Sequence, residues 1–217
     1  MAPAQSLLLN TGRKIPTVGL GVYKTPAEQC TSLIYEALNV GYRHIDSAAL
    51  YDNEEEVCEG IAQWLAEDPS RKREDIFYTT KIGDGSHGYE KAKNAIKVSL
   101  EKAKKIQYID LILIHSPQSD CERRHGTWKA LEEAYEAGTV KNIGVSNYGV
   151  KHLKELLAYP DLKRPESCRP RGRENGREVQ QNRRSDPHKV VSRTRFHHPA
   201  EDRHQGPTGP EPRRVQL

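Results

Sequence analysis

The feature that most constrains the fold of this chain is an alternation of short apolar runs with amphipathic helical stretches over residues 1–163. One run, YIDLILI at 108–114, is almost continuously apolar, as expected for a strand that is covered on both faces. Parallel strands need a crossover between them, usually a helix, and five such units can be recognised. The sequence therefore predicts an α/β fold that begins a (β/α)8 barrel.

The expected elements can be given as residue ranges. A turn at Asn10, Thr11 and Gly12 predicts a hairpin that precedes the first barrel strand. The barrel strands are expected at 18–23, 42–46, 76–82, 108–114 and 140–146. Five helices are expected between and after these strands. The first is capped by Thr25 and ends at Gly41, and the second starts near Asn53. The other three are expected at about 88–104, 126–137 and 150–158.

Four polar residues lie at or just after the expected strands. Asp46 ends the second strand, Tyr51 follows shortly after it, Lys81 lies near the end of the third, and His115 follows the fourth. Taken singly, each fits a structural explanation, such as a turn cap, a surface aromatic, a solvated charge or a buried histidine. The carboxyl ends of barrel strands share one face, where active sites lie, so the joint placement predicts an enzyme.

The pattern stops near residue 163, and the composition changes with it. Residues 164–217 contain 13 Lys and Arg against 7 Asp and Glu, whereas residues 1–163 contain 21 against 23. The net charge of +4 therefore belongs to the last segment, and the first segment shows no basic face for nucleic acid. With six residues of the Val, Ile, Leu, Met and Phe set, 164–217 cannot bury enough apolar surface, and it is expected to be a disordered tail.

Two long motifs carry a resemblance to a known family. GYRHIDSAALYDNEEEVCEG at 41–60 resembles the first signature of the aldo-keto reductases, and KNIGVSNY at 141–148 resembles the second. The similarity covers about residues 7–163. It implies the TIM barrel fold, and it implies an oxidoreductase that reduces an aldehyde or ketone to an alcohol by hydride transfer from NADPH.

The resemblance also assigns catalytic roles residue by residue. Tyr51 matches the general acid that protonates the carbonyl oxygen. Lys81 matches the lysine whose ammonium lowers the pKa of that tyrosine, and Asp46 would pair with it. His115 matches the histidine that hydrogen-bonds the carbonyl oxygen and orients the substrate.

The cofactor contacts follow from the same resemblance. Ser146 and Asn147 match the pair that holds the nicotinamide carboxamide, Asp46 is expected to contact the cofactor as well, and Tyr23 lines the mouth of the site as an apolar wall.

No metal site is expected, because the cysteines form no zinc spacing. These are Cys30, Cys58, Cys121 and Cys168. Reduced thiols and the lack of a membrane span favour a cytoplasmic protein. The oligomeric state stays open at this point, and the resemblance implies a monomer for the intact family fold.

Residues 164–217 depart from the family pattern. The remaining strands and the residues that grip the adenosine phosphate have no counterpart there, so we expect the 217-residue chain itself to show no NADPH-dependent aldehyde reduction. The alternative to a reductase is a non-catalytic product of an altered reading frame or a retained intron, or a protein that binds polyanions through its basic tail. For a reductase, the expected partner is a small carbonyl compound, and binding to a specific nucleic acid or to a membrane is not expected.

Overall fold

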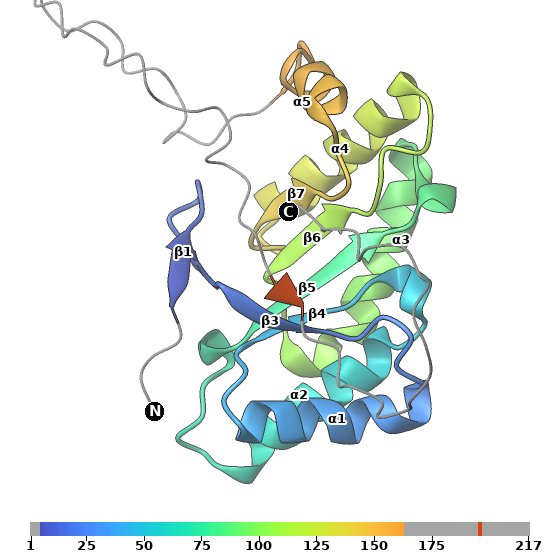
Figure 1. Cartoon of the computed structure of the whole chain (residues 1–217). Helices are drawn as coiled ribbons and strands as arrows, with labels where there is room; N and C mark the ends of the chain where they lie inside the picture. Colours follow the sequence, from blue (N-terminus) through green and yellow to red (C-terminus); the bar gives the residue numbers. More distant parts are fainter. Residues whose placement is uncertain (1–4, 163–194, 197–217) are drawn as a thin grey trace, which may run out of the picture.

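A computed structural model describes residues 5–162 and the backbone of 195–196 (Figure 1). Five parallel strands follow one another across the sheet in chain order. They are β3 (Val18–Gly21), β4 (His44–Asp46), β5 (Phe77–Ile82), β6 (Leu111–Ile114) and β7 (Ile143–Val145). The predicted βα succession is confirmed for this part of the chain.

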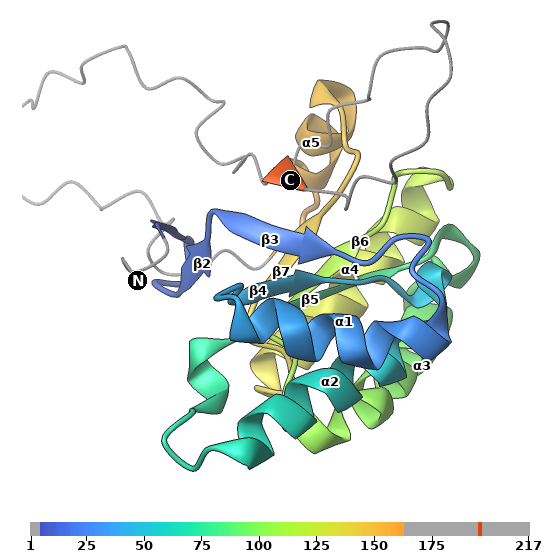
Figure 2. The ribbon, with the colours of Figure 1, turned by 60° about the horizontal axis from the view of Figure 1, so that its bottom comes forward.

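Five helices connect and follow these strands. They are α1 (Ala27–Asn39), α2 (Glu54–Glu67), α3 (Tyr89–Lys102), α4 (Cys121–Glu136) and α5 (Val150–Leu157). The helices α1, α2 and α3 lie against the same face of the sheet (Figure 2). This is the arrangement that right-handed crossovers produce on a parallel sheet.

The main hydrophobic core lies between the sheet and the helices. It joins side chains such as Ile34 of α1, Ile61 of α2, Ile112 of β6 and Leu131 of α4, all of them fully buried. At Gly60 the helices α1 and α2 approach so closely that an added Cβ would lie 2.6 Å from the carbonyl oxygen of Thr31. The missing side chain at this position therefore sets the distance between the two helices.

A hairpin and a buried ion pair lie at the amino ends of the strands. The strands β1 (Ser6–Leu8) and β2 (Lys14–Pro16) pair antiparallel, as predicted. Nearby, Arg73 donates to Asp110 at 2.7 Å and to the carbonyl oxygens of Ile106, Ile76 and Tyr108. Every one of these acceptors comes from the connections before β5 or β6, so Arg73 fixes this end of the sheet.

Two predicted helix boundaries are wrong. Thr25 does not cap α1, because the N-cap position belongs to Pro26 and no side chain bonds there. The helix α4 begins at Cys121 rather than near 126, because the carboxylate of Asp120 accepts a hydrogen bond from the backbone N–H of Arg123 and starts the helix. The polar sequence CERRH, which lacks an apolar stripe, hid this first turn.

The expectation of a disordered tail at 164–217 falls outside the described residues, apart from 195–196. The sequence pattern predicts no strand there. In the structure, β8 (Arg195–Phe196) pairs parallel with β3, with Val18 opposite Arg195 and Gly19 opposite Phe196. Among the described residues, β8 and β7 therefore form the two edges of the sheet.

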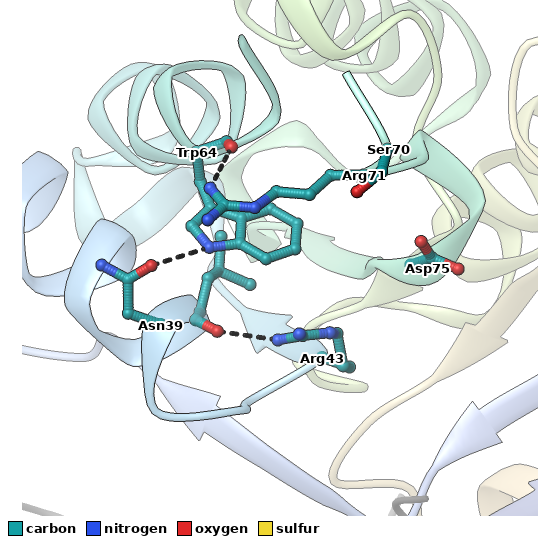
Figure 3. A pocket seen from close by; sticks show the side chains of 7 residues that line it. Asn39, Arg43, Trp64, Ser70, Arg71 and Asp75 are labelled. Carbon is teal, nitrogen blue, oxygen red and sulfur yellow. Dashed lines mark hydrogen bonds between the residues drawn. The ribbon is translucent and has the colours of Figure 1, made fainter. Parts of the chain in front are cut away.

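A polar pocket lies at the amino end of the sheet, away from the strand ends that carry the predicted site (Figure 3). Its floor is Trp64, whose indole N–H donates to Asn39 at 3.0 Å. The guanidinium groups of Arg43 and Arg71 lie 4.7 and 4.2 Å from the indole ring. Both also donate to backbone carbonyl oxygens, Arg43 to that of Leu38 and Arg71 to that of Trp64. These contacts end α1 and α2, so Trp64 packs in the structure and the pocket belongs to the scaffold.

Candidate active site

A buried ion pair forms the centre of the site. Asp46 is the last residue of β4, and Lys81 lies on the neighbouring strand β5. Lys81 Nζ donates to Asp46 Oδ2 at 2.6 Å and to the carbonyl oxygen of Ser47 at 2.8 Å. Both side chains are about 95% buried, with 5% and 4% exposed. Burial lowers the pKa of Lys81 and raises the pKa of Asp46, while their mutual attraction opposes both changes.

One carboxylate oxygen of this pair has no partner. Asp46 Oδ1 is buried and makes no hydrogen bond with any described residue. A buried acceptor without a donor is costly, so a hydroxyl or amide group that reached this oxygen would be stabilised. The site therefore fits a ligand that brings a donor to Asp46.

Tyr51 lies directly beside the ion pair. It ends the short helical turn η1 (Ala49–Tyr51), which follows β4, and its hydroxyl lies 3.4 Å from Lys81 Nζ. The predicted lowering of the tyrosine pKa is not found: burial, followed by the charge of Asp46 and by Tyr23, raises the pKa of Tyr51 well above its usual range. Burial is the largest cause, and Asp46 in addition compensates the charge of Lys81 at shorter range.

His115 borders Tyr51 from the loop after β6, two strands away from β4. It follows β6, and its ring meets the ring of Tyr51 edge to face, with 5.7 Å between the centroids. Burial, and then the charge of Lys81, lower the pKa of His115, whereas the charge of Asp84 raises it. A lowered pKa keeps the imidazole neutral at neutral pH, so it can donate from one ring nitrogen and accept at the other.

Ser146 and Asn147 follow β7 at the same end of the sheet. Asn147 Nδ2 donates to the carbonyl oxygen of His115 at 2.8 Å and to Ser146 Oγ at 3.2 Å. Ser146 is almost fully buried. The two predicted cofactor residues are therefore joined directly to the loop that carries His115.

Tyr23 closes the site on the side of β3. Its ring lies 5.1 Å from that of Tyr51, and about half of the residue is exposed. Three residues that follow predicted site residues have left-handed backbone conformations, namely Lys24, Asp52 and Asn147, with φ of 63°, 53° and 61°. Backbone strain of this kind is concentrated at functional sites.

Asn53 also belongs to the site, although the sequence pattern marks it only as the start of a helix. It is fully buried, it accepts from Ser47 Oγ at 2.9 Å, and it donates to the carbonyl oxygens of Val22 and Thr25. Asn53 thus joins the loops after β3 and β4, which carry Tyr23 and Tyr51. Its place inside the motif at 41–60 was the available signal.

The described residues bring all the predicted site residues to one end of the sheet, and no group of three or more His, Cys, Asp or Glu within 5–162 could hold a metal ion. The same part of the chain contains no helix with the length and apolarity to cross a membrane. The comparison with protein families then identifies the chain, because the sequence model described as the aldo/keto reductase family matches residues 17–169. The chain belongs to the aldo/keto reductase family.

Individual relatives agree with this assignment. An uncharacterized oxidoreductase of Saccharomyces cerevisiae is 52% identical over 156 residues, which cover 71% of this chain and 55% of the relative. The glycerol 2-dehydrogenase (NADP(+)) of Hypocrea jecorina is 38% identical, with 74% of this chain and 58% of the relative covered. The chain thus spans little more than half the length of these curated relatives.

Solved structures of aldo/keto reductases have the same fold. The enzyme of Brucella melitensis superposes with a TM-score of 0.66 and 39% identity, covering 71% of this chain and 58% of that one. The Bombyx mori aldo-keto reductase in complex with NADP superposes with a TM-score of 0.68 and 32% identity, covering 75% of this chain and 57% of that one. The predicted family and the barrel-type fold are confirmed for this part of the chain.

Proposed function

We propose that this site reduces an aldehyde or ketone to an alcohol with NADPH, and that Tyr51 is the general acid. The observation that carries the proposal is the arrangement of three side chains, in which Lys81 Nζ lies 2.6 Å from Asp46 and 3.4 Å from the hydroxyl of Tyr51. A phenol held beside a lysine at the carboxyl end of a barrel sheet can release a proton and have the resulting phenolate stabilised.

The cofactor, when bound, supplies a hydride to the carbonyl carbon. Tyr51 donates its proton to the carbonyl oxygen, and the Lys81 ammonium stabilises the phenolate that remains. Because its pKa is raised, Tyr51 carries its proton at neutral pH and can act as an acid. His115, neutral in the site, donates a hydrogen bond to the carbonyl oxygen and directs it toward Tyr51.

The residues present fit the nicotinamide end of the cofactor. Among residues 5–162, no group bonds the buried acceptor Asp46 Oδ1, which suits a hydroxyl donor of the ribose. Ser146 and Asn147 offer a hydroxyl and a side-chain carbonyl to the carboxamide, and Tyr23 offers a half-exposed aromatic face as a wall for substrate. The NADP-bound relative from Bombyx mori supports the choice of cofactor. A cytoplasmic location stays a prediction.

The test joins residues 1–162 of this chain to the part of the Saccharomyces cerevisiae relative that follows its aligned segment. We call this protein the hybrid reductase. It is expected to oxidise NADPH in the presence of an aromatic aldehyde, and a hybrid that folds and binds NADPH without turnover would contradict the proposal. The 217-residue chain is assayed beside it, with the sequence-based expectation that it shows no reduction. Salt-sensitive binding to heparin without NADPH binding would instead support the polyanion-binding alternative.

A further inference from the structure

A second group of polar side chains lies beside His115, and the proposed reaction gives it no role. Asp84 begins the short helical turn η3 (Asp84–Ser86) in the loop after β5, and Ser116 follows His115 directly in the chain. Ser116 Oγ donates to Asp84 Oδ1 at 2.7 Å. This bond joins the loop after β5 to the loop after β6.

His87 joins the same two loops at a second point. Its Nδ1 lies 2.7 Å from Ser119 Oγ, and its Nε2 lies 3.5 Å from Asp84 Oδ1. The ring is almost completely buried, and Nε2 makes no hydrogen bond with any described residue. We call the set of Asp84, His87, Ser116 and Ser119 the loop clasp.

The helices behind the loop clasp are in close contact without it. The backbone N–H of Gly88 donates to Thr127 Oγ1 at 2.8 Å, and a Cβ added to Gly126 would lie 2.8 Å from the backbone nitrogen of Tyr89. These contacts already hold the start of α3 against α4. The bonds of the loop clasp therefore act mainly on the loops themselves, which lie at the active-site end of the sheet.

We propose that Asp84 is a positioning residue for His115, an inference that rests on the proposed role of His115 in carbonyl reduction. Asp84 accepts a hydrogen bond from Ser116, the residue directly after His115. From the side of β7, Asn147 donates to the carbonyl oxygen of His115 at 2.8 Å. The backbone at His115 is thus fixed from both neighbouring loops, and the backbone limits the directions that the imidazole can take.

Asp84 also acts on His115 through its charge. The charged and titratable groups that face His115 are Lys81 from β5, Tyr51 from η1 and Asp84 from η3. Lys81 lowers the pKa of His115 and Asp84 raises it, so the carboxylate partly offsets the neighbouring ammonium. His87 also faces Asp84. Burial lowers the pKa of His87, the charge of Asp84 opposes this change, and the charges of Arg124 and Arg123 add to it.

The test follows the histidine Cε1–H signals of the 217-residue chain by NMR during a pH titration, with His115 assigned from His115→Gln. Asp84→Asn keeps an oxygen acceptor for Ser116 and removes the charge, so it is expected to lower the titration midpoint of His115. Ser116→Ala keeps the charge and removes the bond, so it is expected to shift the backbone amide signals of His115 at constant pH. Ser116→Thr restores a hydroxyl and is expected to restore those signals.

The matched control is Glu90→Gln, which removes one carboxylate from the exposed start of the next helix. If neither Asp84→Asn nor Ser116→Ala moves the His115 signals more than this control does, the inference is wrong. Thermal unfolding of each variant identifies one that fails to fold, and Asp84→Asn is nearly isosteric. None of these measurements needs cofactor or turnover. If the His115 signals do not shift, only the role of Asp84 is contradicted and the proposed reaction is unaffected. If the signals shift as expected but the hybrid reductase is inactive, only the proposed reaction is contradicted.

Discussion

The buried histidine His44 makes the stability of the protein depend on pH. It is the first residue of β4 and is fully buried, with Nε2 2.9 Å from Thr79 Oγ1. A Cβ added to Gly19 would lie 2.8 Å from its Nδ1, so Gly19 packs directly against that side of the ring. Burial lowers the pKa of His44 to about 4, with a backbone contact at Pro16 opposing and the charge of Lys81 adding to the decrease.

The sign and size of the effect follow from this pKa. An unfolded chain binds a proton at this histidine below pH about 6.5, whereas the folded chain binds it only below about 4. The free energy of unfolding therefore falls as the pH falls through this window. The full difference corresponds to about 3 kcal/mol, and about 2 kcal/mol of it is lost between about pH 7.5 and about pH 5.

Urea unfolding, followed by tryptophan fluorescence at these two pH values, measures the effect. His44→Gln removes the titrating group and keeps a side chain that can bond Thr79, so it is expected to be less stable at the higher pH but to lose less on acidification. The difference from the unmodified protein should reach about 2 kcal/mol, or about 1 M in the urea midpoint. His125→Gln, which replaces a partly exposed histidine, is the control. Equal losses in the unmodified protein and in His44→Gln would refute the reasoning.

Three further predictions test the site and the core. In the hybrid reductase, Tyr51→Phe should reduce turnover by about 10² to 10⁴ and leave quenching of NADPH fluorescence intact, and a loss of less than about twofold would exclude Tyr51 as the acid. Lys81→Met should lower the free energy of unfolding by about 3 to 5 kcal/mol, because it leaves a buried carboxylate unpaired. Adding Asp46→Asn should recover most of this loss, and an equally unstable double variant would argue against the buried pair. Gly60→Ala should cost about 1 to 3 kcal/mol despite better helix propensity. Gly83→Ala, where an added Cβ meets nothing within 4 Å, should be close to neutral, and similar values for the two would contradict the packing argument.

The βα succession was predictable because each strand and helix has a strong local signal. The run at 108–114 was predicted to be a covered strand, and β6 lies within it at Leu111–Ile114. The start of α4 was not predictable from apolar spacing, because its first turn depends on one hydrogen bond from Arg123 to Asp120. Boundaries of this kind depend on capping groups whose geometry the sequence pattern does not contain.

The candidate site shows a similar division. The strand ends placed Asp46, Lys81 and His115 together, because the register of a parallel sheet brings the ends of its strands to one edge. The direction of the Tyr51 pKa could not be predicted, because it depends on burial and on how closely Asp46 compensates Lys81. The partnership of Asp84 with Ser116 joins residues 32 positions apart and left no sequence signal.

The left-handed conformations at Lys24, Asp52 and Asn147 have a consequence for how this protein could be stabilised. A residue other than glycine, asparagine or aspartate in this conformation costs about 1 kcal/mol or more, and Lys24 is the clearest case, with φ of 63°. Glycine at this position would remove the steric cost, but it would also free the turn that carries Tyr23. Selection for thermostability alone would therefore favour substitutions in the turns that shape the mouth of the site. A variant stabilised in this way should be tested for lost substrate discrimination before it is used as a scaffold.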